Sequence, residues 1–466
     1  MEQASPHVAE QIHRIETGLQ SDAPLWSQEA KPATISERLA RHATPAVSVA
    51  IINDGVVEWA RGYGVVESGR SIPVTAETIF QAGSISKHVA MAGVLRLVQK
   101  GLLDLDTDGN HYLTSWRIPP NDTWQPSLTL RQLLAHTAGL SYTWYRGFAR
   151  GAPTPTLLQV LDGQPPANTP PVRVVLLPGS QFRYSGSHYT VIQQVMIDVT
   201  AMTFPEVMHT LVFEPLGMRN SSYDQAYPTT RPETTAVGHH IGGAPIHGKW
   251  RIVVEMAGAG LWTTPTDLAQ VAIALQQAYT GNSAAFLSQA LVQEALTPQG
   301  NATYGLGTRF WGEAAQRRFG HGGDTIGYTC RSVALLTRGQ GAVVMTNSDD
   351  GHLVVNELLQ VIEREYAWPA EQPRRSVLAQ KPEALDRYVG SYELLEGYVL
   401  AVQRHQDRLE LHIPGQPPVP LQSSAVDVFF SDGVNSELRF SRDAAGLITG
   451  LVLVQEGQEQ PASKKV

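Results

Sequence analysis

Residues 83 to 87 read Gly-Ser-Ile-Ser-Lys and open a long apolar run. A serine hydroxyl attacks a carbonyl when a nearby base takes its proton, and a lysine can be that base when burial lowers its pKa. Side chains three positions apart share a helix face, whereas sequence neighbours do not. Ser84 and Lys87 can therefore touch, while Ser86 and Lys87 point apart. The first turn of a helix also directs free backbone N–H groups toward an oxyanion formed on Ser84.

The same stretch allows a purely structural interpretation. Apolar residues recur at helical spacing from Lys87 to Lys100 until Gly101 ends the pattern, which predicts a buried helix. Serine is a preferred N-cap residue, and on residue types alone a cap is the more frequent use of Ser84. Further motifs are needed to decide between cap and nucleophile.

Two other stretches carry side chains suited to proton transfer. Tyr184 stands just ahead of a helical pattern in GSQFRYSGSHYTVIQQVM, and His321 precedes two glycines in the β-rich run RFGHGGDTIGYTC. Taken alone, Tyr184 is typical of a core tyrosine with one hydrogen bond, and His321 of a strand histidine that faces solvent. Gly322 and Gly323 would let a substrate backbone or acyl group approach an edge strand closely.

Together these three motifs resemble a known family. Ser84-x-x-Lys87, Tyr184-Ser185-Gly186 and His321-Gly322-Gly323 follow the order found in the penicillin-recognising serine hydrolases. The resemblance is to the branch that contains class C β-lactamases, D-aminopeptidases, D-alanyl-D-alanine carboxypeptidases and related esterases. The connecting segments LLAHTAGL, EPLGMRNSSY and AGAGLWTTPTDLA are also similar to that family, so the resemblance spans about residues 40 to 365.

The resemblance implies a role for each motif. Ser84 would be the nucleophile, with Lys87 and Tyr184 moving its proton and Tyr184 later serving as acid for the leaving group. His321 would complete the catalytic set. The oxyanion hole would combine the N–H groups of Ser84 and Asp324, and the substrate would lie along Gly322 and Gly323.

Two positions depart from the family pattern. The tyrosine motif usually ends in Asn, which helps to hold the substrate, but this chain has Gly186, and Ser187 is the candidate substitute. The third motif often begins with Lys, where this chain has His321. A histidine is only partly charged near neutral pH, so its attraction for a substrate carboxylate is weaker and depends more on pH. Both departures weaken the case for penicillin hydrolysis.

The predicted function is that of a serine hydrolase that cleaves amide or ester bonds through an acyl-enzyme. A peptidase or amidase of D-amino-acid substrates is favoured, and a carboxylesterase with weak β-lactamase activity is the first alternative. The second alternative is a penicillin-binding sensor that is acylated without turnover. The aromatic segment SYTWYRGF, Ser141 to Phe148, either lines the substrate cleft or packs over the core.

Composition limits the other partners and cofactors. A net charge of -8 argues against nucleic acid, and no apolar run reaches the roughly 20 residues of a membrane span. The single cysteine, Cys330, excludes an intrachain disulfide and a cysteine metal cluster. His239, His240 and His247 lie in a glycine-rich stretch without a carboxylate pair, so we expect a surface loop, no metal and no cofactor. The expected partner is a small-molecule or short-peptide substrate, with a homo-oligomer possible.

The N-terminal residues bear on localisation. They lack the basic start and apolar stretch of a signal peptide, which predicts a cytoplasmic protein if this is the native start. If a leader has been removed, the protein would be periplasmic or secreted.

The sequence predicts two domains of α/β class (α+β type). A β-lactamase/transpeptidase-like catalytic domain over 1–367 would combine an antiparallel sheet, flanking helices and a helical subdomain. Its strands come from both ends: a hairpin turns at Asn53-Asp54-Gly55, and more strands follow Thr303, after a mainly helical middle. A linker is expected over 368–383, and a small antiparallel barrel over 384–466 that resembles the family's lipocalin-like domain.

Overall fold

The computed structural model describes residues 5–20, 32–121, 124–312, 316–369, 378, 380–395, 398–405, 408–413, 418–431, 436–455 and 458–465. Residues 33–369 make up most of a first compact unit, and the described residues from 378 onward make up most of a second. Within the predicted linker, residues 370–377 and 379 lie outside the described residues. No helix in the described ranges is both long and apolar enough to cross a membrane.

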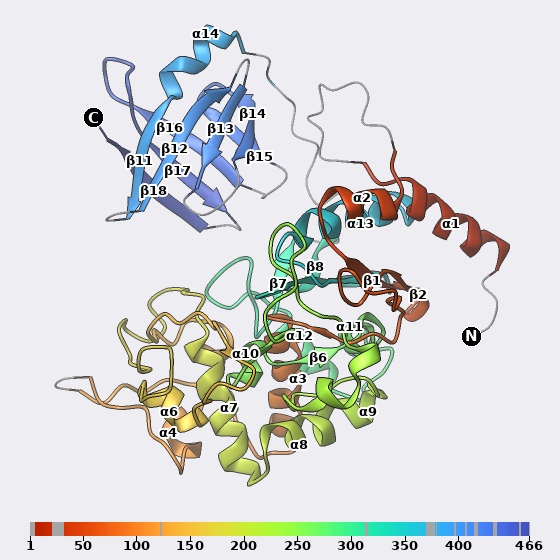
Figure 1. Ribbon diagram of the computed structural model, residues 1–466. Helices are drawn as coiled ribbons and strands as arrows, with labels where there is room; N and C mark the ends of the chain where they lie inside the picture. The colour runs from red at the N-terminus through yellow and green to blue at the C-terminus, as the bar shows by residue number, and fades with distance from the viewer. Residues whose placement is uncertain are drawn as a thin grey trace. The chain divides into compact units, whose positions relative to one another are not determined.

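The first unit is built on a six-stranded antiparallel sheet with the order β2-β1-β10-β9-β8-β7 (Figure 1). As the sequence predicts, the sheet draws on both ends of the unit. Asp54 and Gly55 join the first hairpin with φ values of 51° and 73°, as a tight two-residue turn requires. The strands are β1 (Ala46–Asn53), β2 (Val56–Gly64), β7 (Arg309–Trp311), β8 (Arg318–Thr325), β9 (Tyr328–Leu335) and β10 (Gly341–Thr346).

Both faces of the sheet are covered, which gives the unit two cores. Alternate residues of β1 point to opposite faces, so Val47, Val49 and Ile51 pack in one core while Ala46 and Ala50 pack in the other. The first core lies under α1 (Pro6–Thr17), α2 (Ile35–Arg41) and α13 (Gly351–Glu365). The second lies under α11 (Pro265–Thr280) and extends into the helical part.

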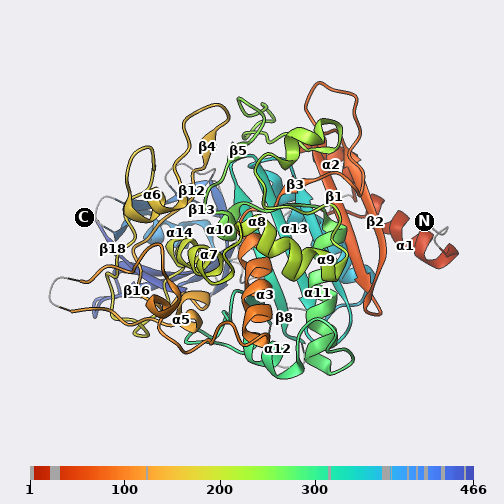
Figure 2. The ribbon, with the colours of Figure 1, turned by 90° about the horizontal axis from the view of Figure 1, so that it is seen from below.

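The helical part surrounds α3 (Ile85–Gln99), which contacts β8 on one side and α8 on another (Figure 2). Nearly all residues of α3 are buried, as expected for a helix that is apolar all round. The other helices are α4 (Gly109–Tyr112), α5 (Leu130–Leu134), α6 (Leu157–Asp162), α7 (Ser187–Thr200), α8 (Phe204–Met208), α9 (Glu214–Leu216), α10 (Met256–Ala259) and α12 (Gln289–Ala295). The short strands β3 (Phe80–Gln81), β4 (Phe148–Ala149), β5 (Arg251–Ile252) and β6 (Trp262–Thr263) form two small pairs.

The second unit is a closed antiparallel barrel in which each strand pairs with the next and the last with the first. Its interior is a separate apolar core that includes Tyr388, Leu411 and Leu438. The short helix α14 (Pro382–Leu385) precedes β11 (Gly390–Leu395), β12 (Tyr398–His405), β13 (Arg408–His412), β14 (Val419–Ala425), β15 (Val428–Ser431), β16 (Ser436–Arg442), β17 (Ile448–Gln455) and β18 (Gln458–Lys464). The predicted barrel is therefore present.

Candidate active site

Ser84 stands at the N-terminus of α3 but does not cap it. The residue occupies the N-cap position without any side-chain hydrogen bond to the helix backbone. Its Oγ instead accepts a hydrogen bond of 2.8 Å from Nζ of Lys87. Within residues 81–90, Ser84 alone is partly exposed. The hydroxyl is therefore both reachable and in contact with a base, as the three-residue spacing predicts.

Lys87 is buried, with 1% of its surface exposed. Its Nζ also donates to the carbonyl of Gly258 at the end of α10, over 2.9 Å. Burial, reinforced by the positive charge of Arg309, lowers the pKa of Lys87 to about 7. At neutral pH a large fraction of Lys87 is thus uncharged and able to accept a proton.

Strand β8 passes directly beside the Ser84 turn. A methyl group placed on Gly323 would lie 1.9 Å from the carbonyl oxygen of Ala82, and one on Gly83 would lie 2.7 Å from the amide nitrogen of Asp324. Gly83 also has a φ of +51°, which favours glycine. These contacts hold the backbone of Asp324 against the turn that carries the nucleophile.

Tyr184 lies just before α7 and beside Lys87. The centre of its ring is 5.1 Å from Nζ of Lys87 and 5.3 Å from the guanidinium carbon of Arg309. The ring of His136 packs against it at 4.4 Å between centres. The structure therefore brings Ser84, Lys87 and Tyr184 together.

His321 lies beneath this group rather than at its surface. It is 1% exposed, and its Nε2 is 3.2 Å from the hydroxyl of Tyr304. Burial, together with the charges of Arg309 and Lys87, lowers the pKa of His321 well below the usual range. The imidazole is therefore neutral near pH 7, and the expected partial charge for a substrate carboxylate is absent from this position. The ring centres of His321 and Tyr184 are 6.1 Å apart.

Ser187, the expected substitute for the family's asparagine, is not brought to the pocket. Its side chain is fully buried and donates a hydrogen bond to the carbonyl of Ser141, and its Oγ is 2.8 Å from Oγ of Ser185. These bonds fix the loop ahead of the site and leave Ser187 away from any substrate. The space beside Gly186 is filled by Tyr145 instead.

A pocket opens at Ser84, and its lining includes residues that the sequence did not single out. Of the aromatic segment 141–148, three consecutive residues reach it, so the interpretation as a cleft lining holds for Thr143, Trp144 and Tyr145. The segment SYTWYRGF does not single out Tyr145, because its position in the pocket depends on contacts between distant segments. The pocket is lined by Ser84, Lys87, Thr143, Trp144, Tyr145, Tyr184, Gly186, Ala259 and Asp324.

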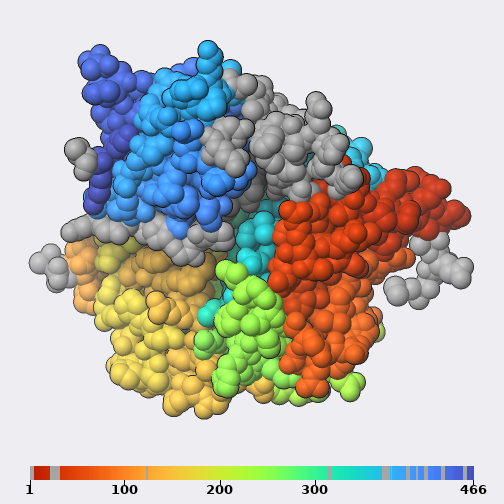
Figure 3. Space-filling model, turned by 45° about the horizontal axis from the view of Figure 1, so that its top comes forward, coloured from red at the N-terminus to blue at the C-terminus, as the bar shows by residue number. Residues whose placement is uncertain are grey.

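The histidine-rich segment has structural contacts. His239 accepts a hydrogen bond of 3.0 Å from the amide of Ser68, and its Nδ1 is 3.0 Å from the carbonyl oxygen of Asn347. This segment, light green in Figure 3, lies beside the orange segment that follows β2. In the ranges that the structure describes, no group of three or more histidine, cysteine, aspartate or glutamate residues is arranged to hold a metal ion.

Comparison with known proteins identifies the family. The β-lactamase family model matches residues 32–364, well over half of the chain. The chain belongs to the β-lactamase family. A second model, a domain of unknown function (DUF3471), matches residues 374–464, which hold the barrel strands.

Three curated relatives illustrate the range of this family. The chain is 23% identical over 440 residues to penicillin-binding protein 4* of Bacillus subtilis (strain 168), covering 88% of this chain and 92% of the relative. It is 28% identical to a D-aminopeptidase of Gluconobacter oxydans (strain 621H), over 41% of this chain and 34% of that enzyme. It is 29% identical to esterase EstB of Burkholderia gladioli, over 42% of this chain and 50% of the esterase.

The same architecture occurs in solved structures. The octameric penicillin-binding protein homologue from Pyrococcus abyssi matches with a TM-score of 0.56 at 20% identity, covering 92% of this chain and 98% of that one. At this identity the likeness concerns the fold.

Proposed function

We propose that this β-lactamase-family protein is a serine hydrolase that cleaves amide or ester bonds through an acyl-enzyme on Ser84. The observation that carries the proposal is the hydrogen bond of 2.8 Å between Lys87 Nζ and Ser84 Oγ, made by a lysine whose pKa is about 7. A buried amine of this basicity is matched to proton transfer at neutral pH. Ser84 remains partly exposed toward the pocket, where a carbonyl can reach it.

Acylation begins when uncharged Lys87 takes the proton of Ser84 and the oxygen attacks the substrate carbonyl. The C–N or C–O bond then breaks, and the leaving group takes a proton from the Lys87 and Tyr184 pair. The ring centre of Tyr184 lies 5.1 Å from Nζ of Lys87, and this proximity supports a role for Tyr184 in the proton transfer. Water releases the acyl group by the same steps in reverse, and Ser84 regains its hydrogen.

The oxyanion donors proposed here are the backbone N–H groups of Ser84 and Asp324. The amide of Ser84 lies at the start of α3, and the backbone of Asp324 is held beside Gly83 by the close passage of β8. Oxyanion donors of this kind each contribute about 3 to 4 kcal/mol to transition-state stabilisation. The expectation that a substrate lies along Gly322 and Gly323 is not supported. Gly323 packs against the carbonyl of Ala82, a methyl group on Gly322 would lie 3.7 Å from the Arg331 side chain, and neither glycine lines the pocket.

The favoured substrates are D-aminoacyl amides or short peptides, with carboxylesters second. Similarity to a D-aminopeptidase and to an esterase supports both classes. Penicillin hydrolysis is disfavoured, because His321 is neutral and buried and Gly186 offers no side chain. A sensor without turnover is also disfavoured, because the base Lys87 and Tyr184 are both present for deacylation.

The assembly state completes the proposal. A homo-oligomer is proposed from the likeness to an octameric homologue, and light scattering on the intact protein tests it.

The decisive experiment pairs two serines. Wild type, Ser84→Ala and Ser86→Ala are assayed with p-nitrophenyl esters, D- and L-aminoacyl anilides, D-Ala-D-Ala peptides and nitrocefin. Ser86 donates to the carbonyl of Gly83 and accepts from the amide of Leu261, so its loss should lower stability but leave turnover largely intact. Ser84→Ala should abolish turnover of every substrate. Similar losses in both variants would contradict the assignment, and a burst without a steady state in wild type would favour the sensor.

A further inference from the structure

Tyr145 lies between two glycines at the pocket. A methyl group placed on Gly186 would lie 2.5 Å from its Cζ, and one placed on Gly258 would lie 2.3 Å from its Cε2. Real Cβ atoms do not approach a ring so closely. The phenol therefore occupies space that side chains at positions 186 and 258 would otherwise fill.

The ring is held in place by polar contacts at its tip. The hydroxyl of Tyr145 donates to the carbonyl of Gly186 and is 3.5 Å from Oγ1 of Thr190. Burial raises the pKa of the Tyr145 hydroxyl well above its ordinary value, so it remains a neutral donor. The ring centre also lies 5.3 Å from Nζ of Lys87.

Little room remains beside the nucleophile. The cavity beside Ser84 has a volume of about 10 Å³, room for about one water molecule. Tyr145 and Trp144 both line it, and the Trp144 side chain extends from the loop with 55% of its surface exposed. Two adjacent aromatic residues thus form one wall of the space beside Ser84.

We propose that Tyr145, assisted by Trp144, determines specificity by restricting Ser84 to short acyl groups such as acetyl, propionyl, glycyl or D-alanyl. This inference rests on the proposed function and deepens it. Because positions 186 and 258 beside the ring are glycines, neither can supply a side chain to this wall when Tyr145 is truncated. The space released would be continuous with the pocket and available to a longer acyl chain.

The test is the chain-length profile of ester hydrolysis. Rates with p-nitrophenyl acetate, butyrate, hexanoate and octanoate are compared for wild type, Tyr145→Ala, Tyr145→Phe and Trp144→Ala. Tyr142→Ala is the matched control, because Tyr142 is an aromatic residue of the same loop, is 52% exposed and does not line the pocket. Binding differences of one or two methylenes in a tight pocket correspond to about 10-fold or more in kcat/KM.

We expect wild-type kcat/KM to fall at least about tenfold from acetate to hexanoate, and Tyr145→Ala to flatten or reverse that fall. Trp144→Ala should flatten this fall in part. Because the Trp144 side chain is exposed, its truncation should not prevent folding, so Trp144→Ala is the variant to use if Tyr145→Ala does not fold. Tyr145→Phe keeps the ring and should keep the wild-type profile, as should Tyr142→Ala.

Three results would overturn the inference alone: a wild-type preference for hexanoate or octanoate, an unchanged profile in folded Tyr145→Ala, or a Tyr145→Phe profile like that of Tyr145→Ala. By contrast, absence of hydrolysis and of acylation at Ser84 in wild type would contradict the proposed function itself, and the inference with it.

Discussion

At the scale of single residues, the site depends on which partner each polar side chain finds. Ser84 sits where a capping serine would sit, yet its hydroxyl bonds to Lys87, whereas Ser86 bonds to backbone on both sides. The same residue type is therefore reactive at one position and structural two positions later. Burial then gives Lys87 a pKa that an exposed lysine does not have.

The low pKa of Lys87 predicts the pH dependence of catalysis. Only the uncharged amine accepts a proton from Ser84, so activity should be present above the pKa and lost as pH falls through about 7. Below that point kcat/KM should fall about tenfold per pH unit, and above it the rate should level off. The measurement is kcat/KM from pH 5 to 9 for the best ester or amide.

Glu255 provides the control for this profile. Its carboxyl is buried, and burial raises its pKa to about 7 as well, so it titrates in the same range. Glu255→Gln removes that group and keeps its shape. The fall in kcat/KM below pH 7 should persist in Glu255→Gln. If this fall disappears in Glu255→Gln, Glu255 and not Lys87 controls the activity.

Residue spacing predicted the contact between Ser84 and Lys87, because three positions along a helix fix which side chains meet. It could not predict that Tyr145 would fill the space beside Gly186, since these positions meet only through the fold. Ser187 was assigned to the substrate because it follows Gly186, but the first turn of α7 directs it toward Ser141. The burial of His321 likewise depends on Tyr304.

At the scale of elements, a buried ion pair connects α2 and α13, the two helices that cover one face of the sheet. Nε of Arg38 in α2 lies 3.2 Å from Oε2 of Glu357 in α13, and both side chains are 4% exposed. Nε2 of His42 lies 3.3 Å from the other carboxylate oxygen. A charge this deeply buried destabilises a protein strongly once its partner is removed.

Removing one partner should therefore cost more than removing both. Glu357→Leu leaves the Arg38 charge buried and should lower the free energy of unfolding by about 3 to 5 kcal/mol. The double variant Arg38→Met/Glu357→Leu should recover a substantial part of this loss. Urea unfolding of wild type, Arg38→Met, Glu357→Leu and the double variant measures the cycle. Equal losses in single and double variants would show that packing rather than charge explains the effect.

Elements with a clear local pattern were predicted well. The hairpin at Asp54-Gly55 and the helix after Lys87 follow from turn chemistry and apolar spacing, with helix ends shifted by a residue or two. The barrel strands β14 and β18 have weak local signals, because Pro420 and Pro461 and many polar residues interrupt their β pattern. Closing the barrel pairs them with neighbours that already have strong strand signals, so tertiary structure overrides local preference.

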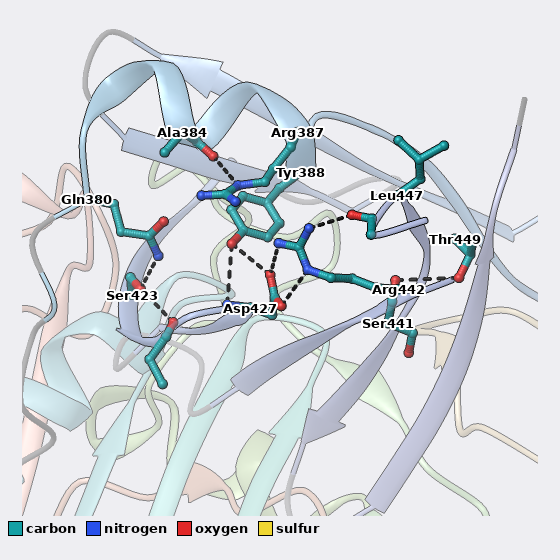
Figure 4. A network of polar contacts seen from close by, with 12 residues as sticks. Gln380, Ala384, Arg387, Tyr388, Ser423, Asp427, Ser441, Arg442, Leu447 and Thr449 are labelled. Atoms are coloured by element: carbon teal, nitrogen blue, oxygen red, sulfur yellow. Dashed lines mark hydrogen bonds and ion pairs between the residues drawn. The ribbon is translucent and has the colours of Figure 1, made fainter. Parts of the chain in front are cut away.

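At the scale of the whole molecule, the barrel has its own means of stability. Figure 4 shows Asp427 bonded to both Tyr388 and Arg442, with distances of 2.8 Å to the Tyr388 hydroxyl and 2.7 Å to Nε of Arg442. The rings of Tyr388 and Phe429 meet in the barrel core at 4.7 Å between centres. These contacts tie the segment before β11 to the β14–β15 turn and to β16, all within one unit.

The catalytic unit should accordingly function without the barrel, provided that the cut respects its own core. Trp368 is buried in that core beneath the guanidinium of Arg318, and Arg318 donates to the carbonyl of Pro369 over 2.7 Å. A chain ending after Pro369 keeps these contacts, while one ending after Tyr366 loses them. The shorter chain should be less stable by about 3 kcal/mol or more, the usual cost of losing a buried tryptophan.

Every residue that lines the pocket precedes residue 325, so the chain that ends after Pro369 should still be acylated at Ser84. We expect no set of nucleophile, base and acid in the described residues of the barrel, so its removal should change KM, substrate size preference or assembly state instead. Burst-phase ester kinetics and light scattering on the full-length and truncated proteins measure both. Complete loss of acylation in a truncated protein with a cooperative unfolding transition would show that the barrel supplies part of the active site.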